Sequence, residues 1–332
     1  MTSRALDELT AELTQLVAAP GPSGGEHAVA DVVERLLGAS ALVVSRDALG
    51  TVRAVGGPAR PRILVTAHLD QVGYMVSRVG ADGVRCLPVG EPALASARAA
   101  VRVLAAPTAC AAELDAPEDG AAVLRGVGVS DVRVGDRIVF SGVLERGTGA
   151  RVRGPALDNR IGCLVALRAA RILAAESEAV AFAWTVQEET TQAGVIRVAR
   201  ELEPDAVIAV DVTPATAESD SGSLVALGHG PVVTLLDGGM VGDAGLVRGF
   251  REAAEASGVA WQPEVVGDGI SEAGHVQGTL GIPALALLVA IEDAHSPREA
   301  ADLDDVRGAV NLLVAGVRRL LAGPARTRSP PA

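Results

Sequence analysis

Residues 62–70 read RILVTAHLD, a continuous apolar run that ends in a histidine and an aspartate. An apolar run without alternation is typical of a strand that is buried on both faces of a sheet. Similar runs occur at 180–187, 206–212 and 283–291. We therefore predict that these segments are the central strands of an α/β domain.

Amphipathic helices separate these strands. Apolar residues recur at helical spacing near the N-terminus, at Leu6, Leu9, Leu13 and Leu16, and a similar pattern returns between the strands. The predicted helices cover 6–17, 26–37, 159–175, 192–202 and 303–321. Because strands alternate with helices, we predict a sheet that is covered by helices on both faces.

The stretch 72–153 has a different pattern. Short β-like runs, among them YMVSRV and RIVFSG, alternate with Gly, Asp and Pro turns, and no long amphipathic helix interrupts them. We predict a small β-rich domain here, inserted into an α/β domain made of residues 1–71 and 154–325. The tail, residues 326–332, is predicted to be disordered.

Composition excludes several classes of partner. The chain has 332 residues, of which 49% are hydrophobic, and a formal net charge of -12, which argues against nucleic acid as a partner. Its apolar runs are shorter than the roughly 20 residues that span a bilayer, so no membrane contact is expected. No signal peptide is recognisable, and Cys86, Cys110 and Cys163 form no CxxC pair. We therefore expect a cytoplasmic protein without disulfides.

Side chains that can bind metal ions lie at or near the ends of the predicted strands. In an open α/β sheet, ligands bind beyond the carboxyl ends of the strands, so these side chains should meet at one edge. Imidazole and carboxylate groups together suit a pair of zinc-like divalent cations, because a carboxylate can bridge two ions. The candidates are His68, Asp70, Asp158, Glu188, Glu189, Asp211 and His295.

Such a ligand set indicates amide hydrolysis. Divalent cations polarise a scissile carbonyl and lower the pKa of a water molecule. The reaction also needs a carboxylate that binds no metal, which takes the water's proton and passes it to the leaving amine. The adjacent Glu188 and Glu189 could divide the roles of base and ligand between them.

Six segments, in order along the chain, match the pattern of a single known family. No single segment is decisive, but the ordered set is specific and extends over almost the whole chain. The segments are AAPGPSGGE (18–26), TAHLDQVGYMV (66–76), PALDNRIGC (155–163), WTVQEE (184–189), AVDVTPA (209–215) and DAHSP (293–297). Together they resemble metallopeptidase family forty-two, the glutamyl and leucyl aminopeptidases.

The resemblance implies a dinuclear metal site. His68, Asp158 and Asp211 would bind one cation, and Glu189, His295 and Asp158 would bind the other, with Asp158 as the bridge. The cations implied are zinc or cobalt, with manganese as a further candidate. The expected activity is the hydrolysis of N-terminal amide bonds of short peptides or small amides.

The resemblance also implies roles for the remaining candidates and for the insertion. Glu188 would be the general base and then the acid, and Asp70 would orient His68. The fold would be a zinc-peptidase-like mixed sheet with a small β-barrel-like insertion that serves dimerisation. Homo-oligomers are expected, as a dimer or as the family's tetrahedral dodecamer.

The sequence departs from the family pattern near the substrate. Gln71 replaces a glutamate, Glu272 lies in GISEA where the family has G-[GT]-D-A, and residues 292–294 replace an Arg-Tyr pair. Loss of an arginine and gain of acids disfavour an acidic N-terminal residue, so we expect a neutral or basic one. Glu272 and His275 are further candidates for a ligand or a proton relay.

Other functions stay open from the sequence. A metal-dependent deacylase or amidase that acts on a small N-acyl metabolite would use the same ligands. A glycosidase needs only two carboxylates and would leave both histidines without a purpose. A non-catalytic assembly protein would not need an intact set of ligands and base.

Overall fold

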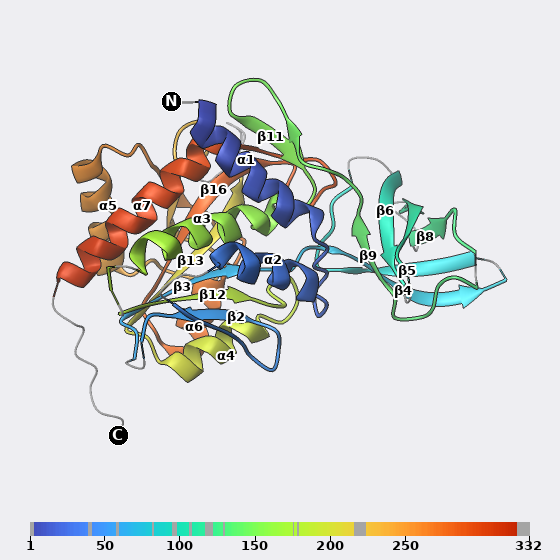
Figure 1. The fold of residues 1–332 in the computed structure, drawn as a ribbon, viewed down its shortest axis with the longest axis horizontal. Coiled ribbons are helices and arrows are strands. Elements are labelled where there is room, and N and C mark those ends of the chain that lie inside the picture. The colour runs from blue at the N-terminus through green and yellow to red at the C-terminus, as the bar shows by residue number, and fades with distance from the viewer. Residues whose placement is uncertain are drawn as a thin grey trace.

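The structure is a computed structural model. It describes residues 3–323 except 39–41, 58–59, 82, 95–97, 106–107, 117–121, 129, 175, 178 and 216–223. The predicted disordered tail, 326–332, lies outside the described residues. Figure 1 shows a large body, in which helices pack on a central sheet, and a smaller all-β body to one side.

Within the described residues, the main sheet is mixed and has 11 strands. They are β1 (Val43–Arg46), β2 (Val52–Val55), β3 (Ile63–His68), β10 (Glu145–Arg146), β11 (Arg151–Gly154), β12 (Val180–Thr185), β13 (Ala206–Pro214), β14 (Val232–Leu236), β15 (Gln262–Val265), β16 (Ala284–Glu292) and β17 (Glu299–Asp302). Their order is β1-β2-β12-β3-β13-β16-β17-β11-β10, and β14 pairs with β15 and β16. The neighbours β12, β3, β13 and β16 are parallel, so their carboxyl ends share one edge.

Helices cover both faces of this sheet, as predicted (Figure 1). One face packs against α1 (Ser3–Ala18), α2 (His27–Leu37), α3 (Leu157–Leu173), α5 (Ala244–Ser257) and α7 (Leu303–Ala322). The other packs against α4 (Ala193–Leu202) and α6 (Glu272–Leu280).

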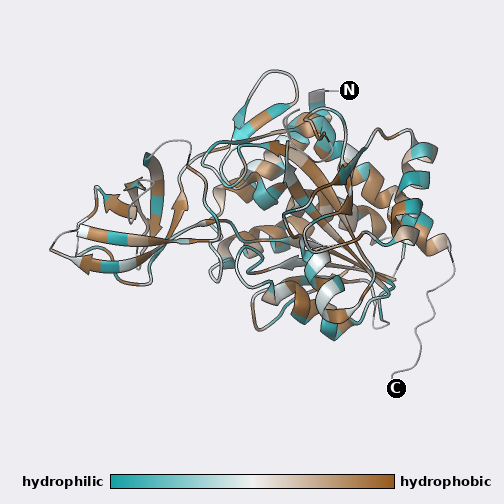
Figure 2. Ribbon diagram, turned by 180° about the vertical axis from the view of Figure 1, so that it is seen from behind, coloured by the Kyte–Doolittle hydropathy of each residue, from teal (hydrophilic) through white to brown (hydrophobic). Residues whose placement is uncertain are grey.

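The two faces of the central strands differ in side-chain size. On β16, Leu285 and Leu287 lie in the core under the larger helix layer, whereas Ala284 and Ala286 face α4 and α6. Every one of these positions is buried, which explains why the strand is a continuous apolar run. Figure 2 shows the same apolar character along the strands of the main sheet.

The smaller body is a closed barrel with strand order β4-β5-β8-β7-β6-β9. The strands are β4 (Gly73–Gly80), β5 (Gly83–Val89), β6 (Arg98–Leu104), β7 (Cys110–Asp115), β8 (Ala122–Arg125) and β9 (Arg137–Phe140). Alternate residues point inward, as at Val101 and Val103 of β6, and form a core separate from those of the main sheet. The predicted fold class, an α/β sheet with a barrel-like insertion, is confirmed.

The structure differs from the sequence analysis at the edges. Residues 145–153, assigned to the insertion, include β10 and most of β11, and β11 pairs with β17 of the main sheet. A run as short as RVRG shows β propensity but does not indicate its partner strand. The β1–β2 hairpin, β14, α5 and β15 were not predicted, because short strands and an alanine- and glycine-rich helix give weak periodic signals.

Cys86, Cys110 and Cys163 are free cysteines in the structure. Among the described residues, no helix combines the length and the apolar character that crossing a membrane requires.

The close packing of α3 on β13 can be tested at Gly162. A Cβ there would lie 2.5 Å from the carbonyl oxygen of Val210, so Gly162→Ala should destabilise the fold by about 1–3 kcal/mol in urea denaturation. The control is Gly278→Ala on α6, where a Cβ meets nothing within 4 Å and helix propensity predicts equal or higher stability. Equal stability of the two variants would contradict this packing.

Candidate metal centre

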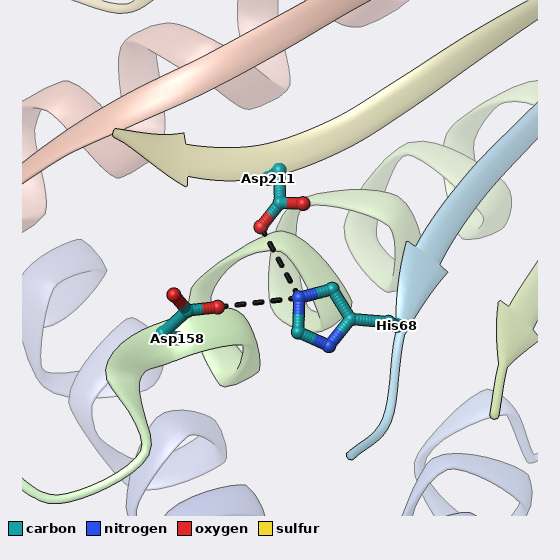
Figure 3. Close-up of side chains that lie close together, drawn as sticks. All are labelled: His68, Asp158 and Asp211. Carbon is teal, nitrogen blue, oxygen red and sulfur yellow. Dashed lines mark ion pairs between the residues drawn. The ribbon is translucent and has the colours of Figure 1, made fainter. Parts of the chain in front are cut away.

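The predicted ligands meet at the carboxyl edge of the central strands. His68 ends β3, Asp211 lies on β13, and Asp158 lies at the start of α3. Figure 3 shows these side chains pointing toward one another from three separate elements. The remaining ligand candidates, Glu189 and His295, follow β12 and β16.

Asp158 lies between the two histidines. Its Oδ1 is 3.2 Å from Nε2 of His68, and its Oδ2 is 3.2 Å from Nε2 of His295. Nε2 of His68 is also 3.4 Å from Oδ1 of Asp211, and Nε2 of His295 is 3.5 Å from Oε2 of Glu189. These side chains therefore form two triads that share the Asp158 carboxylate, and among the described residues a third group close enough to hold an ion joins His68 to Glu188 and Glu189.

These residues fit divalent cations. In a tetrahedral site with bonds of about 2.0–2.1 Å, neighbouring ligand atoms lie about 3.3 Å apart, close to the separations just given. Oδ1 of Asp158 and Oε1 of Glu189 are buried and have no hydrogen-bond partner among the described residues. Because buried polar atoms are nearly always satisfied, their lack of partners agrees with a metal role.

The backbone around Asp158 is held by Asn159. The Asn159 side chain donates to the carbonyl of Val210 at 2.9 Å and accepts from the N–H of Gly162 at 2.8 Å. Asp158 and Asn159 depart from helical dihedral angles, so the regular part of α3 begins after them. This arrangement fixes Asp158 next to the strand that carries Asp211.

Asp70 connects the histidine of one triad to both glutamates. Its Oδ1 accepts the backbone N–H of Glu188 at 2.8 Å, and its Oδ2 accepts that of Glu189 at 3.1 Å. The Ser23 hydroxyl donates to Oδ2 at 2.5 Å. Nδ1 of His68 lies 3.5 Å from Oδ1 of Asp70, at the outer limit of a hydrogen bond, so this contact is mainly electrostatic.

Burial and crowding shift the pKa values of the acids upward. Burial, with the charge of Asp211 adding to it, raises the pKa of Glu188 to about 8. Burial and the charge of Asp158 raise the pKa of Glu189 well above its ordinary value. Burial also raises the pKa of Asp211. Without a cation, these carboxyl groups therefore tend to retain protons.

The same crowding favours positive charge on the imidazoles. Burial lowers the pKa of His68, but the charges of Asp211 and Glu188 outweigh it, and this pKa lies well above its ordinary value. The hydrogen bond with Asp158 raises the pKa of His295 to about 10. The cluster thus attracts positive charge, whether protons or metal ions.

Sequence reasoning missed two residues of this site. The Gln192 side chain donates to Oε1 of Glu188. Glu299, which is buried, accepts the backbone N–H of Asp158 at 2.9 Å. Neither residue matches a metal-ligand pattern, and Glu299 lies 141 positions from Asp158. Glu299 lies two residues after the end of DAHSP, and nothing in the sequence alone connects it to Asp158.

The departures from the family pattern lie outside the two triads. Oε1 of Gln71 accepts from the N–H of Gly21 at 3.1 Å and from the buried Arg160 at 3.2 Å, so it supports the loop after β3. Glu272 is buried and accepts from the Thr185 hydroxyl, and His275 joins neither triad. Glu292 lies 3.6 Å from Arg151 at the surface.

Comparison with known proteins identifies the family. The model of the M42 glutamyl aminopeptidase family matches residues 125–312, more than half of the chain. This chain belongs to the M42 family. The resemblance inferred from the sequence is therefore confirmed, and the chain is a peptidase of the aminopeptidase class.

Individual M42 relatives and related structures agree with this result. The lysyl aminopeptidase of Pyrococcus furiosus is 28% identical, with 93% of this chain and 96% of that protein covered. The TET aminopeptidase of a marine sediment Thaumarchaeota archaeon superposes with a TM-score of 0.86 at 25% identity, covering 96% of this chain and 98% of that one. The Pyrococcus horikoshii TET1 peptidase, which can assemble into a tetrahedron or an octahedral shell, superposes with a TM-score of 0.81 at 25% identity, covering 92% and 98%.

The pKa shifts predict how pH affects the metal-free protein. Glu188 is raised from 4.5 to about 8 and His295 from 6.5 to about 10, so the folded state binds more protons than the unfolded state across this range. Stability should therefore fall as the pH rises from about 5 to about 9. The measurement is the Tm of chelator-treated protein across this range.

The metal-loaded protein is the control, because it carries the same surface charge. Metal ligands bind in their deprotonated form, so the loaded protein should lose less stability over this range. A Tm of the metal-free protein that is constant or rises with pH would contradict the prediction.

Proposed function

We propose that this chain is a dinuclear metal-dependent aminopeptidase that hydrolyses the N-terminal amide bond of short peptides. The observation that carries the proposal is the position of Asp158, whose two oxygens each lie 3.2 Å from one imidazole. The matching family model and the lysyl aminopeptidase relative support the choice of reaction.

The proposed ligands are divided between the triads. His68, Asp158 and Asp211 would hold one divalent cation, and Asp158, Glu189 and His295 would hold the other. Zinc or cobalt best suits mixed imidazole and carboxylate ligands, and manganese is a further candidate. When bound, the cations supply polarisation of the scissile carbonyl and a lowered pKa of the attacking water.

We assign the general base to Glu188. Its nearest imidazole atom, Nε2 of His68, is 4.0 Å away, whereas Glu189 approaches Nε2 of His295 to 3.5 Å. Gln192 donates to Oε1 of Glu188, so Oε2 is the oxygen that faces the triads. From this position Glu188 accepts the water's proton and passes it to the leaving amine.

Assembly of the chain is part of the proposal. We propose homo-oligomers, with the barrel of residues 73–140 as the dimerisation body and with the tetrahedral dodecamer as a larger form. The support is the likeness to the TET1 peptidase, which can assemble into closed shells.

Replacement of the base tests the mechanism. Glu188→Gln keeps the side-chain size and should lower kcat by about 10²–10⁴-fold, because proton transfer is lost. The metal content of Glu188→Gln should equal that of the unchanged protein, whereas the matched variant Glu189→Gln should bind one of the two cations more weakly. Both are measured as turnover of aminoacyl amides and short peptides beside metal analysis.

Two results would contradict this mechanism. Unchanged turnover in Glu188→Gln would remove the assignment of the base. Absence of turnover in the unchanged protein, with two ions bound per chain, would contradict the proposed aminopeptidase activity. The second result would favour a deacylase that acts on small N-acyl compounds.

Charge around His295 predicts the substrate side chain. Glu91 and Asp293 are exposed, the carbonyl oxygen of Glu91 lies 3.1 Å from Nδ1 of His295, and Asp293 precedes it by two positions. Like-charge repulsion should make N-terminal Leu or Lys amides better substrates than Glu amides in a kcat/KM panel. Glu91→Gln should reduce the difference in kcat/KM between the Leu or Lys amides and the Glu amides. Fastest turnover of Glu amides by the unchanged protein would overturn the prediction.

A further inference from the structure

The two triads are held by different parts of the molecule. His68 is buried at the end of β3 in the main sheet, and it lies beside Asp70 in the loop that follows this strand. His295 is 29% exposed and has a left-handed φ of 61° after the end of β16. A histidine with this φ and this exposure needs other contacts to fix its ring.

Those contacts come from the segment that leaves β5 of the barrel, residues 90–94, which we name the β5 exit segment. The N–H of Ala93 donates to the carbonyl of His295 at 2.9 Å. The carbonyl of Glu91 lies 3.1 Å from Nδ1 of His295. The segment therefore contacts both the backbone and the ring of this histidine.

The contact with Glu91 also fixes the tautomer of His295. A carbonyl oxygen only accepts hydrogen bonds, so Nδ1 of His295 carries the hydrogen. In the neutral ring that a metal ion binds, Nε2 then keeps its lone pair, and it is the atom that faces Asp158 and Glu189. A backbone carbonyl in this role orients a ligating imidazole and raises its basicity.

The same segment packs on Glu189. Gly90 has a φ of +71°, and a Cβ there would lie 2.8 Å from Cγ1 of Val72 and 3.4 Å from Cβ of Glu189. A side chain there would be strained by the positive φ and would press on Val72. The β5 exit segment thus contacts His295 and lies next to Glu189, two of the three residues of the second triad.

We propose that the β5 exit segment controls the affinity of the second cation, at Asp158, Glu189 and His295, separately from that of the first. This inference rests on the ligand assignment of the proposed function. Displacement of the barrel relative to the main sheet would then weaken binding of the second cation. Binding of the first cation, at His68, Asp158 and Asp211, would be unchanged.

The test is a titration of metal-stripped protein with Co²⁺, followed by calorimetry and by metal analysis after dialysis. Gly90→Ala should bind the first ion as the unchanged protein does and the second about 10–100-fold more weakly. The matched control is Gly126→Ala in the barrel, which also has a positive φ, of +78°, but where a Cβ meets nothing within 4 Å. It should bind both ions normally.

Ala93→Pro is a second, independent variant. The position is exposed, and the change removes the N–H that donates to His295 while it leaves the Glu91 carbonyl in place. Ala93→Pro should also lower the affinity for the second ion and leave the affinity for the first ion unchanged. Circular dichroism establishes that each variant is folded.

The outcomes separate this inference from the proposed function. Two ions in the unchanged protein, with the same two affinities in Gly90→Ala and Ala93→Pro, would overturn the inference alone. Equal weakening of both ions in the folded variants would overturn it as well. Fewer than two ions in the unchanged protein would instead contradict the dinuclear site on which it rests.

Discussion

Crowding of carboxylates around two imidazoles, at the edge where the central strands end, is the constraint on which the rest of the structure depends. Asp158, Asp211 and Glu189 are mostly buried, and their charge has to be offset because a buried, unpaired charge costs several kcal/mol. The upward shifts of the pKa values of Glu189 and Asp211 express this cost. Divalent cations would remove it and at the same time supply the chemistry of amide hydrolysis.

The surrounding fold holds these groups together against their repulsion. Asp70 binds the backbone N–H groups of both glutamates, and Glu299 binds that of Asp158. The barrel contributes at two places. Arg137 of β9 donates to the carbonyl of Gly24 at 2.8 Å, near Ser23, and the β5 exit segment holds His295. The insertion is therefore connected to the site.

Much of the fold follows from patterns within single segments. The continuous apolar runs of β3, β12, β13 and β16 reflect burial on both faces. The gathering of candidate ligands at the ends of these strands follows from the parallel arrangement. The pairing of β11 with β17 and the roles of Gln192 and Glu299 depend on contacts between distant segments, which one sequence does not encode in a readable form. The likeness to a known family supplied the division of ligands that spacing alone left open.

The most direct measurement is anomalous diffraction at the cobalt or zinc edge from crystals of the metal-loaded protein. The account predicts two peaks per chain, one among His68, Asp158 and Asp211 and the other among Asp158, Glu189 and His295. Glu188 should lie beside the pair without being a ligand. A single peak, or a peak coordinated by Glu188 in place of Asp158, would contradict the shared carboxylate on which the account is built.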